Sequence, residues 1–266
     1  MSLMSIGYLV RDLPPWFFYG FTLIWVFTAV FVGFGLGATL LKQEHAKDAP
    51  IGSVVGATLG LLAFILAFTF GAAANRFDAR KQLLLDEVNA IGTAYLRSDF
   101  LAASARVQAQ TWLRQYVALR LKSARNPQQV RGYLEKAESI QNQLWRQMRQ
   151  QFQQGDNSPA LALYAAALND MFDLQTKRAT VALQYHVPEM IWLVLYLVTF
   201  LSMVGVGLQF RLSGSRSLMV VSVLALSFSA VIALIGELDR SNGGLLVISQ
   251  QPMLKLAEDL TANKAY

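Results

Sequence analysis

The sequence predicts an all-α integral membrane protein with four transmembrane helices and a large helical cytosolic domain inserted between the second and the third. Three observations predict this fold: four long uncharged apolar runs, one long polar segment between the second and third runs, and the lack of a strand pattern. An α-helix needs about 20 residues to cross a bilayer. Each run reaches that length, and the runs are 16–41, 51–75, 190–210 and 217–236.

The composition agrees with a chain that is partly embedded in lipid. Apolar residues make up 54% of the sequence and charged residues only 15%, whereas soluble domains are about 25% charged. The sequence has no cysteine, which excludes disulfide bonds and thiolate chemistry. We therefore expect one membrane part and one extramembrane part rather than a single globular core.

The excess positive charge lies entirely in the polar segment 76–187. This segment has 15 Lys and Arg against nine Asp and Glu, and the rest of the chain has eight of each sign. Bases close to the ends of membrane helices favour the cytoplasmic side. We therefore expect this large loop to lie in the cytoplasm and, with four spans, both termini to lie there too.

Helix signals divide the chain into four expected parts. Pro14-Pro15 and Pro50 mark the starts of the first two spans, because proline suits the first turn of a helix. The parts are 1–75 with the first transmembrane hairpin, 76–187 as the helical cytosolic domain, 188–236 with the second hairpin, and 237–266 as a cytosolic tail.

Three helices are expected between the second and third spans. Apolar residues recur at helical spacing over 76–121 without a helix breaker, so the second span is predicted to continue as one rod. Asn126-Pro127 ends this rod. The next helix is expected over 128–154, and the last over 160–185, started by a Ser158 cap and Pro159.

Small and aromatic residues recur every four positions along the second span and so share one helix face. Glycine in a membrane helix lets another helix approach closely, and we expect such packing at Gly52, Gly56 and Gly60. Phe64 and Phe68 continue the stripe and suggest a hydrophobic constriction, although phenylalanine in a span also suits lipid or core. In the first span, Gly33 and Gly37 carry the same expectation of close packing.

Three bases follow this stripe toward the polar segment: Arg76, Arg80 and Lys81. We expect them to form a basic vestibule beside the constriction. No ionisable side chain lies deep inside a span, which argues against a proton relay or an ion-coupled carrier. The sequence has no nucleophile elbow, phosphate-binding glycine loop or zinc motif, so we expect no enzyme activity, no cofactor and no metal.

The segment 71–101 contains Glu87, Asn89 and Gly92 within the run Glu-Val-Asn-Ala-Ile-Gly. This run, with Leu238-Asp239 and the tail that follows, resembles the bacterial bestrophin-like membrane proteins, distant relatives of the bestrophin channels. The resemblance implies a homopentamer with both termini inside and a pore lined by the second span, with a phenylalanine neck at Phe64 and Phe68.

The expected role of Glu87, Asn89 and Gly92 is structural. Glu87 is expected to pair with Arg80, Lys81 or a returning base such as Lys177, and Asn89 to cap a neighbouring helix end. The rival interpretation is a ligand site.

The favoured function is therefore an oligomeric ion channel of the bacterial inner membrane that conducts anions, chloride in particular. Its expected partners are other copies of the chain, the lipid bilayer and inorganic ions, with no nucleic acid. Two alternatives stay open: a stator-like energy-transducing protein that needs a partner subunit, and a non-conducting membrane scaffold. The stator needs an ionisable residue from its partner, because this chain supplies none within its spans.

Overall fold

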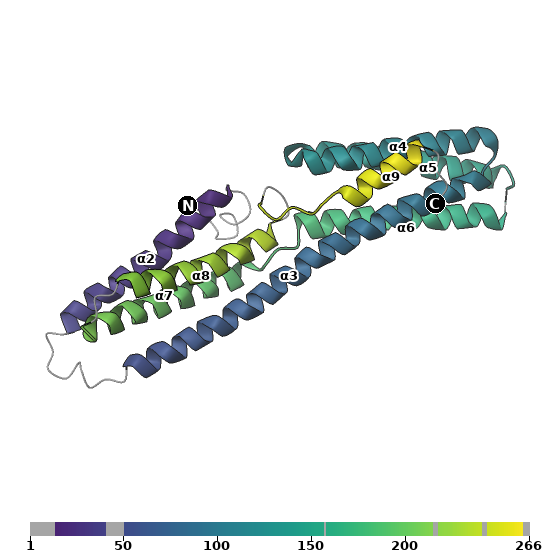
Figure 1. The fold of residues 1–266 in the computed structure, drawn as a ribbon. Coiled ribbons are helices and arrows are strands. Elements are labelled where there is room, and N and C mark those ends of the chain that lie inside the picture. The colour runs from purple at the N-terminus through teal and green to yellow at the C-terminus, as the bar shows by residue number, and fades with distance from the viewer. Residues whose placement is uncertain (1–13, 41–50, 157, 215–217, 241–243, 263–266) are drawn as a thin grey trace, which may run out of the picture. The chain divides into compact units, whose positions relative to one another are not determined.

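The computed structural model describes residues 14–40, 51–156, 158–214, 218–240 and 244–262. Every regular element within these ranges is a helix, which confirms the all-α prediction (Figure 1). The helices form two compact units. We call 1–77 with 186–246 the span unit, and 78–185 with 247–266 the bundle unit.

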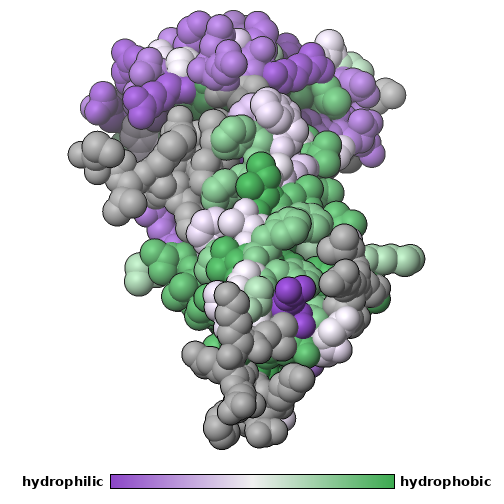
Figure 2. Space-filling model, turned by 90° about the vertical axis from the view of Figure 1, so that its left-hand side faces the viewer, coloured by the Kyte–Doolittle hydropathy of each residue, from purple (hydrophilic) through white to green (hydrophobic). Residues whose placement is uncertain are grey.

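Four helices are long and apolar enough to cross a membrane, as the sequence predicts. They are α2 (Pro15–Leu40), α3 (Ile51–Arg97), α7 (Glu189–Leu212) and α8 (Leu218–Asp239). A helix satisfies its own backbone hydrogen bonds, which is necessary where no water is present. On the surface, hydrophobic and hydrophilic residues gather in separate regions (Figure 2).

The span unit is built around a close contact between α2 and α7. A Cβ atom added to Gly33 would lie 2.1 Å from the Val204 carbonyl oxygen, and one added to Gly207 would lie 2.2 Å from that of Val30. The two backbones therefore approach without side chains between them. The expectation for Gly33 is confirmed, and Gly37 likewise packs against the Arg211 side chain.

Buried polar and aromatic groups add to this contact. The Thr22 and Tyr196 hydroxyl oxygens are 2.7 Å apart, and the Trp25 indole N–H donates to the Tyr196 carbonyl over 3.2 Å. The Phe18 and Trp192 rings meet edge to face, with centroids 5.9 Å apart. A hydrogen bond inside hydrocarbon has no water to compete with it, so these groups help to fix how α2 and α7 are rotated.

The bundle unit contains the last part of α3 and four further helices, joined by two short 3-10 turns. The helices are α4 (Ala103–Arg125), α5 (Val130–Gln153), α6 (Pro159–Leu183) and α9 (Gln251–Thr261), and the turns are η1 (Ser98–Phe100) and η2 (Pro127–Gln129). Ile91, Leu113, Leu144, Leu168 and Leu256 belong to one buried core. The Ser158 cap is confirmed, because its hydroxyl oxygen accepts from the Leu161 N–H over 3.2 Å.

The second span continues into the polar segment as one helix, as predicted, but only to Arg97 and not to 121. The helix α3 ends at Arg97, and Leu101 is extended before α4 begins. Neighbouring contacts hold the break: Arg97 donates to the Leu163 carbonyl oxygen over 2.8 Å, and the buried Ser98 hydroxyl donates to the Tyr95 carbonyl oxygen over 2.5 Å. One local and one long-range hydrogen bond therefore accompany the end of the helix, at a point where the local sequence contains no glycine or proline.

The carboxy-terminal segment 237–266 is divided between the two units. Residues up to Leu246 belong to the span unit and residues from Val247 to the bundle unit. Helix α9 joins the bundle core through its buried side chains Met253, Leu256 and Leu260. The segment that was expected to be a tail therefore contains a helix, which packs as part of the bundle.

We predict that replacing Gly207 with alanine destabilises the protein by about 1–3 kcal/mol, the usual cost of overpacking. The added methyl group would overlap the Val30 backbone, which cannot move without shifting α2. The matched control is Gly20→Ala, because nothing lies within 4 Å of a Cβ atom at that site. Thermal melting of the detergent-solubilised protein measures both; equal melting temperatures for the two variants would contradict the close contact.

Candidate functional site

Helix α3 is the least buried of the four candidate spans. Only 17% of the most apolar 18-residue stretch of α3 is buried, whereas the corresponding share is 28% for α2, 33% for α8 and 44% for α7. Its inward face carries Leu62, Leu66, Thr69 and Ala73, all of which are buried. The opposite face of this stretch, which includes Leu61, Phe64 and Phe68, is exposed within the described part of the chain.

The predicted stripe lies on this open surface. Phe64 is 70% exposed and Phe68 is 68% exposed, and Phe64 points away from the inward face because each residue turns a helix by about 100°. Cβ atoms added to Gly56 or Gly60 would meet nothing within 4 Å. At Gly52 such an atom would lie 3.2 Å from the Gln209 side-chain nitrogen. Tight packing at Gly56 and Gly60 stays a prediction, and it concerns a second molecule.

The three bases that follow the stripe differ in their surroundings. Arg76 is half-buried, and Arg80 is only 6% exposed. Lys81 has a 56% exposed side chain, and its Nζ lies 3.7 Å from Asp78 Oδ1. A base that lines an aqueous mouth must reach water, and among the three Lys81 does so most. The basic vestibule stays a prediction.

Glu87 lies at the centre of a buried polar network in the bundle unit. Its side chain is completely buried. Arg120 Nε donates to Glu87 Oε1 over 2.7 Å, and Arg120 Nη2 donates to Oε2 over 3.1 Å. Arg178 Nη1 also donates to Oε2. The carboxylate is therefore held by a bidentate arginine and by a second arginine from another helix.

Neutral groups extend the network to a fourth helix. The Tyr116 hydroxyl lies 3.0 Å from Glu87 Oε1 and 2.8 Å from Gln175 Oε1, and Gln141 Nε2 donates to Gln175 Oε1 over 2.6 Å. Helices α3, α4, α5 and α6 all contribute. Burial and the neighbouring Glu87 carboxylate raise the pKa of Tyr116 well above its usual value, so this hydroxyl stays protonated and able to donate.

The expected partners of Glu87 need correction. It pairs with Arg120 and Arg178, and not with Arg80, Lys81 or Lys177. Asn89 is exposed, and within the described residues its side chain makes no hydrogen bond, so it caps no helix there. Gly92 is buried. The structural role predicted for Glu87 agrees with its place in the network.

A second polar cluster lies in the span unit at the end of α8. Asp239 Oδ1 accepts from the Val187 N–H over 2.8 Å, one residue before the Pro188 N-cap of α7. Glu237 Oε2 accepts from the Leu245 N–H. A Cβ atom on Gly244 would lie 2.5 Å from this oxygen, so a glycine is needed there. Each of the two carboxylates therefore accepts a hydrogen bond from a backbone N–H group.

Within the described residues, no three His, Asp or Glu side chains gather closely enough to hold a metal ion. The arrangement offers no nucleophile with an adjacent base. Its chemically notable features are therefore the open apolar face of α3 and the buried Glu87 network.

We predict that Glu87→Gln destabilises the protein by about 3–5 kcal/mol, because it leaves the two buried guanidinium groups without a counter-charge. The matched control is the neighbouring Asp86→Asn, since Asp86 only accepts from Gln82 across an exposed surface over 2.9 Å. Melting temperatures in detergent measure both changes. A Glu87→Gln variant as stable as Asp86→Asn would contradict the framework role.

Comparisons with known proteins identify relatives of this fold. A model of the Bestrophin-like domain matches residues 20–253. Similar solved structures include an isoleucine-to-threonine variant of a bacterial bestrophin homolog from Klebsiella pneumoniae, 15% identical, with a TM-score of 0.67 over 90% of this chain and 97% of that one. A tyrosine-to-alanine variant is 14% identical, with a TM-score of 0.65 over 89% and 98%.

No curated protein matches the chain. At these low identities the solved structures show a shared fold, and the membership rests on the family model. Because that model spans most of the sequence, the chain belongs to the bestrophin-like family.

Proposed function

We propose that the chain is the subunit of a homopentameric ion channel in a bacterial inner membrane. Helix α3 of each copy surrounds the pore, and Phe64 and Phe68 form its neck. The bundle unit and both termini lie in the cytoplasm. The observation that carries the proposal is the open apolar face of α3, on which both phenylalanines are about 70% exposed.

The open face suits a hydrophobic neck. It contains no ionisable residue, since none occurs over 51–75. Two rings of phenylalanine offer nothing that replaces the hydration shell of an ion, so they resist ion passage by excluding water. Such a hydrophobic neck acts as a barrier or gate rather than as a binding site.

The proposed substrates are inorganic anions, chloride in particular. The segment 76–187 carries 15 bases against nine acids, and a positive potential on the cytoplasmic side raises the local concentration of anions. A stator would instead need a partner subunit that brings an ionisable residue into the membrane, because none occurs over 51–75 of this chain.

We predict that the double variant Phe64→Ala and Phe68→Ala conducts more than the parent, because it removes both apolar rings while keeping the helix. Liposome flux and planar-bilayer currents measure the change. Phe31→Ala is the matched control, because Phe31 is 64% exposed and belongs to α2 rather than to α3. If the parent and the double variant both assemble but pass no ions under any voltage or gradient, the channel proposal is wrong. The scaffold or the stator is then the better explanation.

We predict that the bundle unit faces the cytoplasm. The chain has no native cysteine, so a single Gln128→Cys substitution on the exposed surface of η2 gives one reporter thiol. An impermeant maleimide should label it only after the cells are permeabilised. Labelling in intact cells would reverse the topology.

A further inference from the structure

The chain leaves α8 through a long uncharged segment. No charged residue occurs over 241–254, and four apolar residues follow one another at 245–248. A connection that lies in water is normally polar. Two of the apolar residues, Leu245 and Leu246, belong to the span unit and are 77% and 40% exposed. Two large apolar side chains are therefore exposed next to each other just after a candidate span.

One hydrogen bond sets the height of Leu245 along the span. The Leu245 N–H donates to Glu237 Oε2, and Glu237 directly follows Gly236, the last residue of the fourth apolar run. Since an α-helix rises about 1.5 Å per residue, Glu237 lies only one such step beyond that run. Leu245 is therefore held beside the point where the apolar part of α8 ends.

The charged side chains at this end of α8 are turned away from the surface. Glu237, Asp239 and Arg240 are 3%, 4% and 5% exposed. The exposed side chain at this height is instead that of Leu245. Exposed apolar groups combined with buried charges are the arrangement expected of a surface that meets lipid rather than water.

The first turn of α2 marks the same height independently. A Cβ atom on Gly236 would overlap the Phe18 ring, so Phe18 lies against α8 next to Glu237. Trp16 and Phe17, in the same turn of α2, are 72% and 41% exposed. Tryptophan is enriched at the boundary between lipid headgroups and hydrocarbon. Two segments that are distant in the sequence therefore expose apolar side chains at one end of the span unit.

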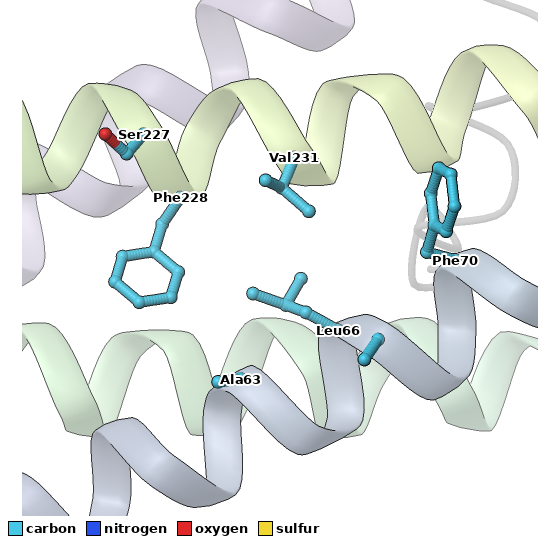
Figure 3. A pocket seen from close by; sticks show the side chains of 7 residues that line it. Ala63, Leu66, Phe70, Ser227, Phe228 and Val231 are labelled. Atoms are coloured by element: carbon cyan, nitrogen blue, oxygen red, sulfur yellow. The ribbon is translucent and has the colours of Figure 1, made fainter.

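The part of α8 inside the span has a similar surface. Ser227, Phe228 and Val231 line a groove that α8 shares with α3 (Figure 3). The polar group among these three, the Ser227 hydroxyl, donates to the Val223 carbonyl oxygen of its own helix over 2.8 Å. The two leucines after α8 continue this apolar composition beyond the end of the helix.

We propose that Leu245 and Leu246 insert into the phospholipid bilayer at the boundary between headgroups and hydrocarbon. Apolar side chains held at this height are stabilised by leaving water, as are those of interfacial anchors. The contact requires only that the spans cross a membrane, so it does not depend on whether the protein conducts ions. Because Glu237 binds the Leu245 backbone, the lipid contact bears directly on the end of α8.

A spin label on the full-length chain tests the contact, because the sequence has no native cysteine. Leu245→Cys is labelled with a nitroxide, and the protein is reconstituted into phosphatidylcholine vesicles. Power saturation compares collisions with oxygen, which concentrates in hydrocarbon, and with a water-soluble nickel chelate. Two reference sites calibrate the ratio: Ile24→Cys, 69% exposed on α2, for hydrocarbon, and Gln128→Cys, exposed on η2, for water.

The ratio of oxygen to nickel collisions for the Leu245 label should be several-fold higher than for the Gln128 label and closer to that of the Ile24 label. A Leu245 label that meets nickel as often as the Gln128 label lies in water, which would overturn the proposal. A label shielded from both reagents would also contradict it, because protein, either another copy or another part of the chain, then covers the leucine.

A charge placed beside the label gives a second measurement. With the label at Leu246→Cys, the additional change Leu245→Asp should raise nickel collisions, because an ionised carboxylate favours water. The matched change Leu245→Ile should leave the collisions as they are. Leu245 is exposed, so both variants should melt at the temperature of the parent. Equal nickel collisions in the aspartate and isoleucine variants would show that lipid does not hold this segment, and the proposal would be wrong.

Discussion

The bundle unit depends on one buried carboxylate. Placing Glu87 at zero exposure is costly for an ionised group, and the cost is offset only because two guanidinium groups and a tyrosine hydroxyl are arranged around both of its oxygens. Those partners come from α4 and α6, so the carboxylate fixes how these helices are rotated against α3. A purely apolar core tolerates several rotations, whereas this network is satisfied in one.

The span unit is held together by different interactions from those of the bundle unit. Lipid tails are as apolar as leucine, so apolar burial does not drive helices together inside a membrane. Two other features hold α2 and α7 together. The backbones are in close contact at Gly33 and Gly207, and the Thr22 and Tyr196 hydroxyls form a hydrogen bond. Gly56 and Gly60 of α3 have no neighbour within 4 Å of an added Cβ atom among the described residues. Glycine thus marks a close contact on α2, whereas packing at Gly56 and Gly60 stays a prediction.

Patterns that depend on local chemistry were predictable from the sequence. The four apolar runs, the start of α2 at Pro15, the Ser158 cap and the helices on either side of it follow from the physics of single helices, whereas Pro50 lies outside the described residues. The end of α3 at Arg97 was not predictable, because it depends on a carbonyl of α6 that is distant in the sequence. The sequence also did not predict that Glu87 pairs with Arg178 rather than with its neighbour Lys177. This pairing depends on the rotation of α6 and on the planar guanidinium group, whose N–H donors match a carboxylate.

The sequence of α9 in the tail carries a weaker structural signal. Met253, Leu256 and Leu260 are spaced three and four apart and form one apolar face on α9. That pattern indicates a surface to be buried, but it does not say against which helix. The buried carboxylates Glu237 and Asp239 had no signal of their own beyond a glycine seven residues after Glu237, and their backbone partners follow only from the fold.

The distribution of charge limits how the proposed pore selects ions. Arg120 and Arg178 are committed to Glu87, Arg80 is buried, and the charge of Lys81 is offset by Asp78. Arg120, Arg178 and Lys81 therefore contribute little net field to an ion at the neck, and Arg76, the base that follows the apolar stripe most closely in the sequence, is half-buried. Exposed bases farther along the bundle act only within a Debye length of about 8 Å at physiological salt. Passage through Phe64 and Phe68 then depends mainly on how readily an ion sheds water, which favours large, weakly hydrated anions over small, strongly hydrated ones.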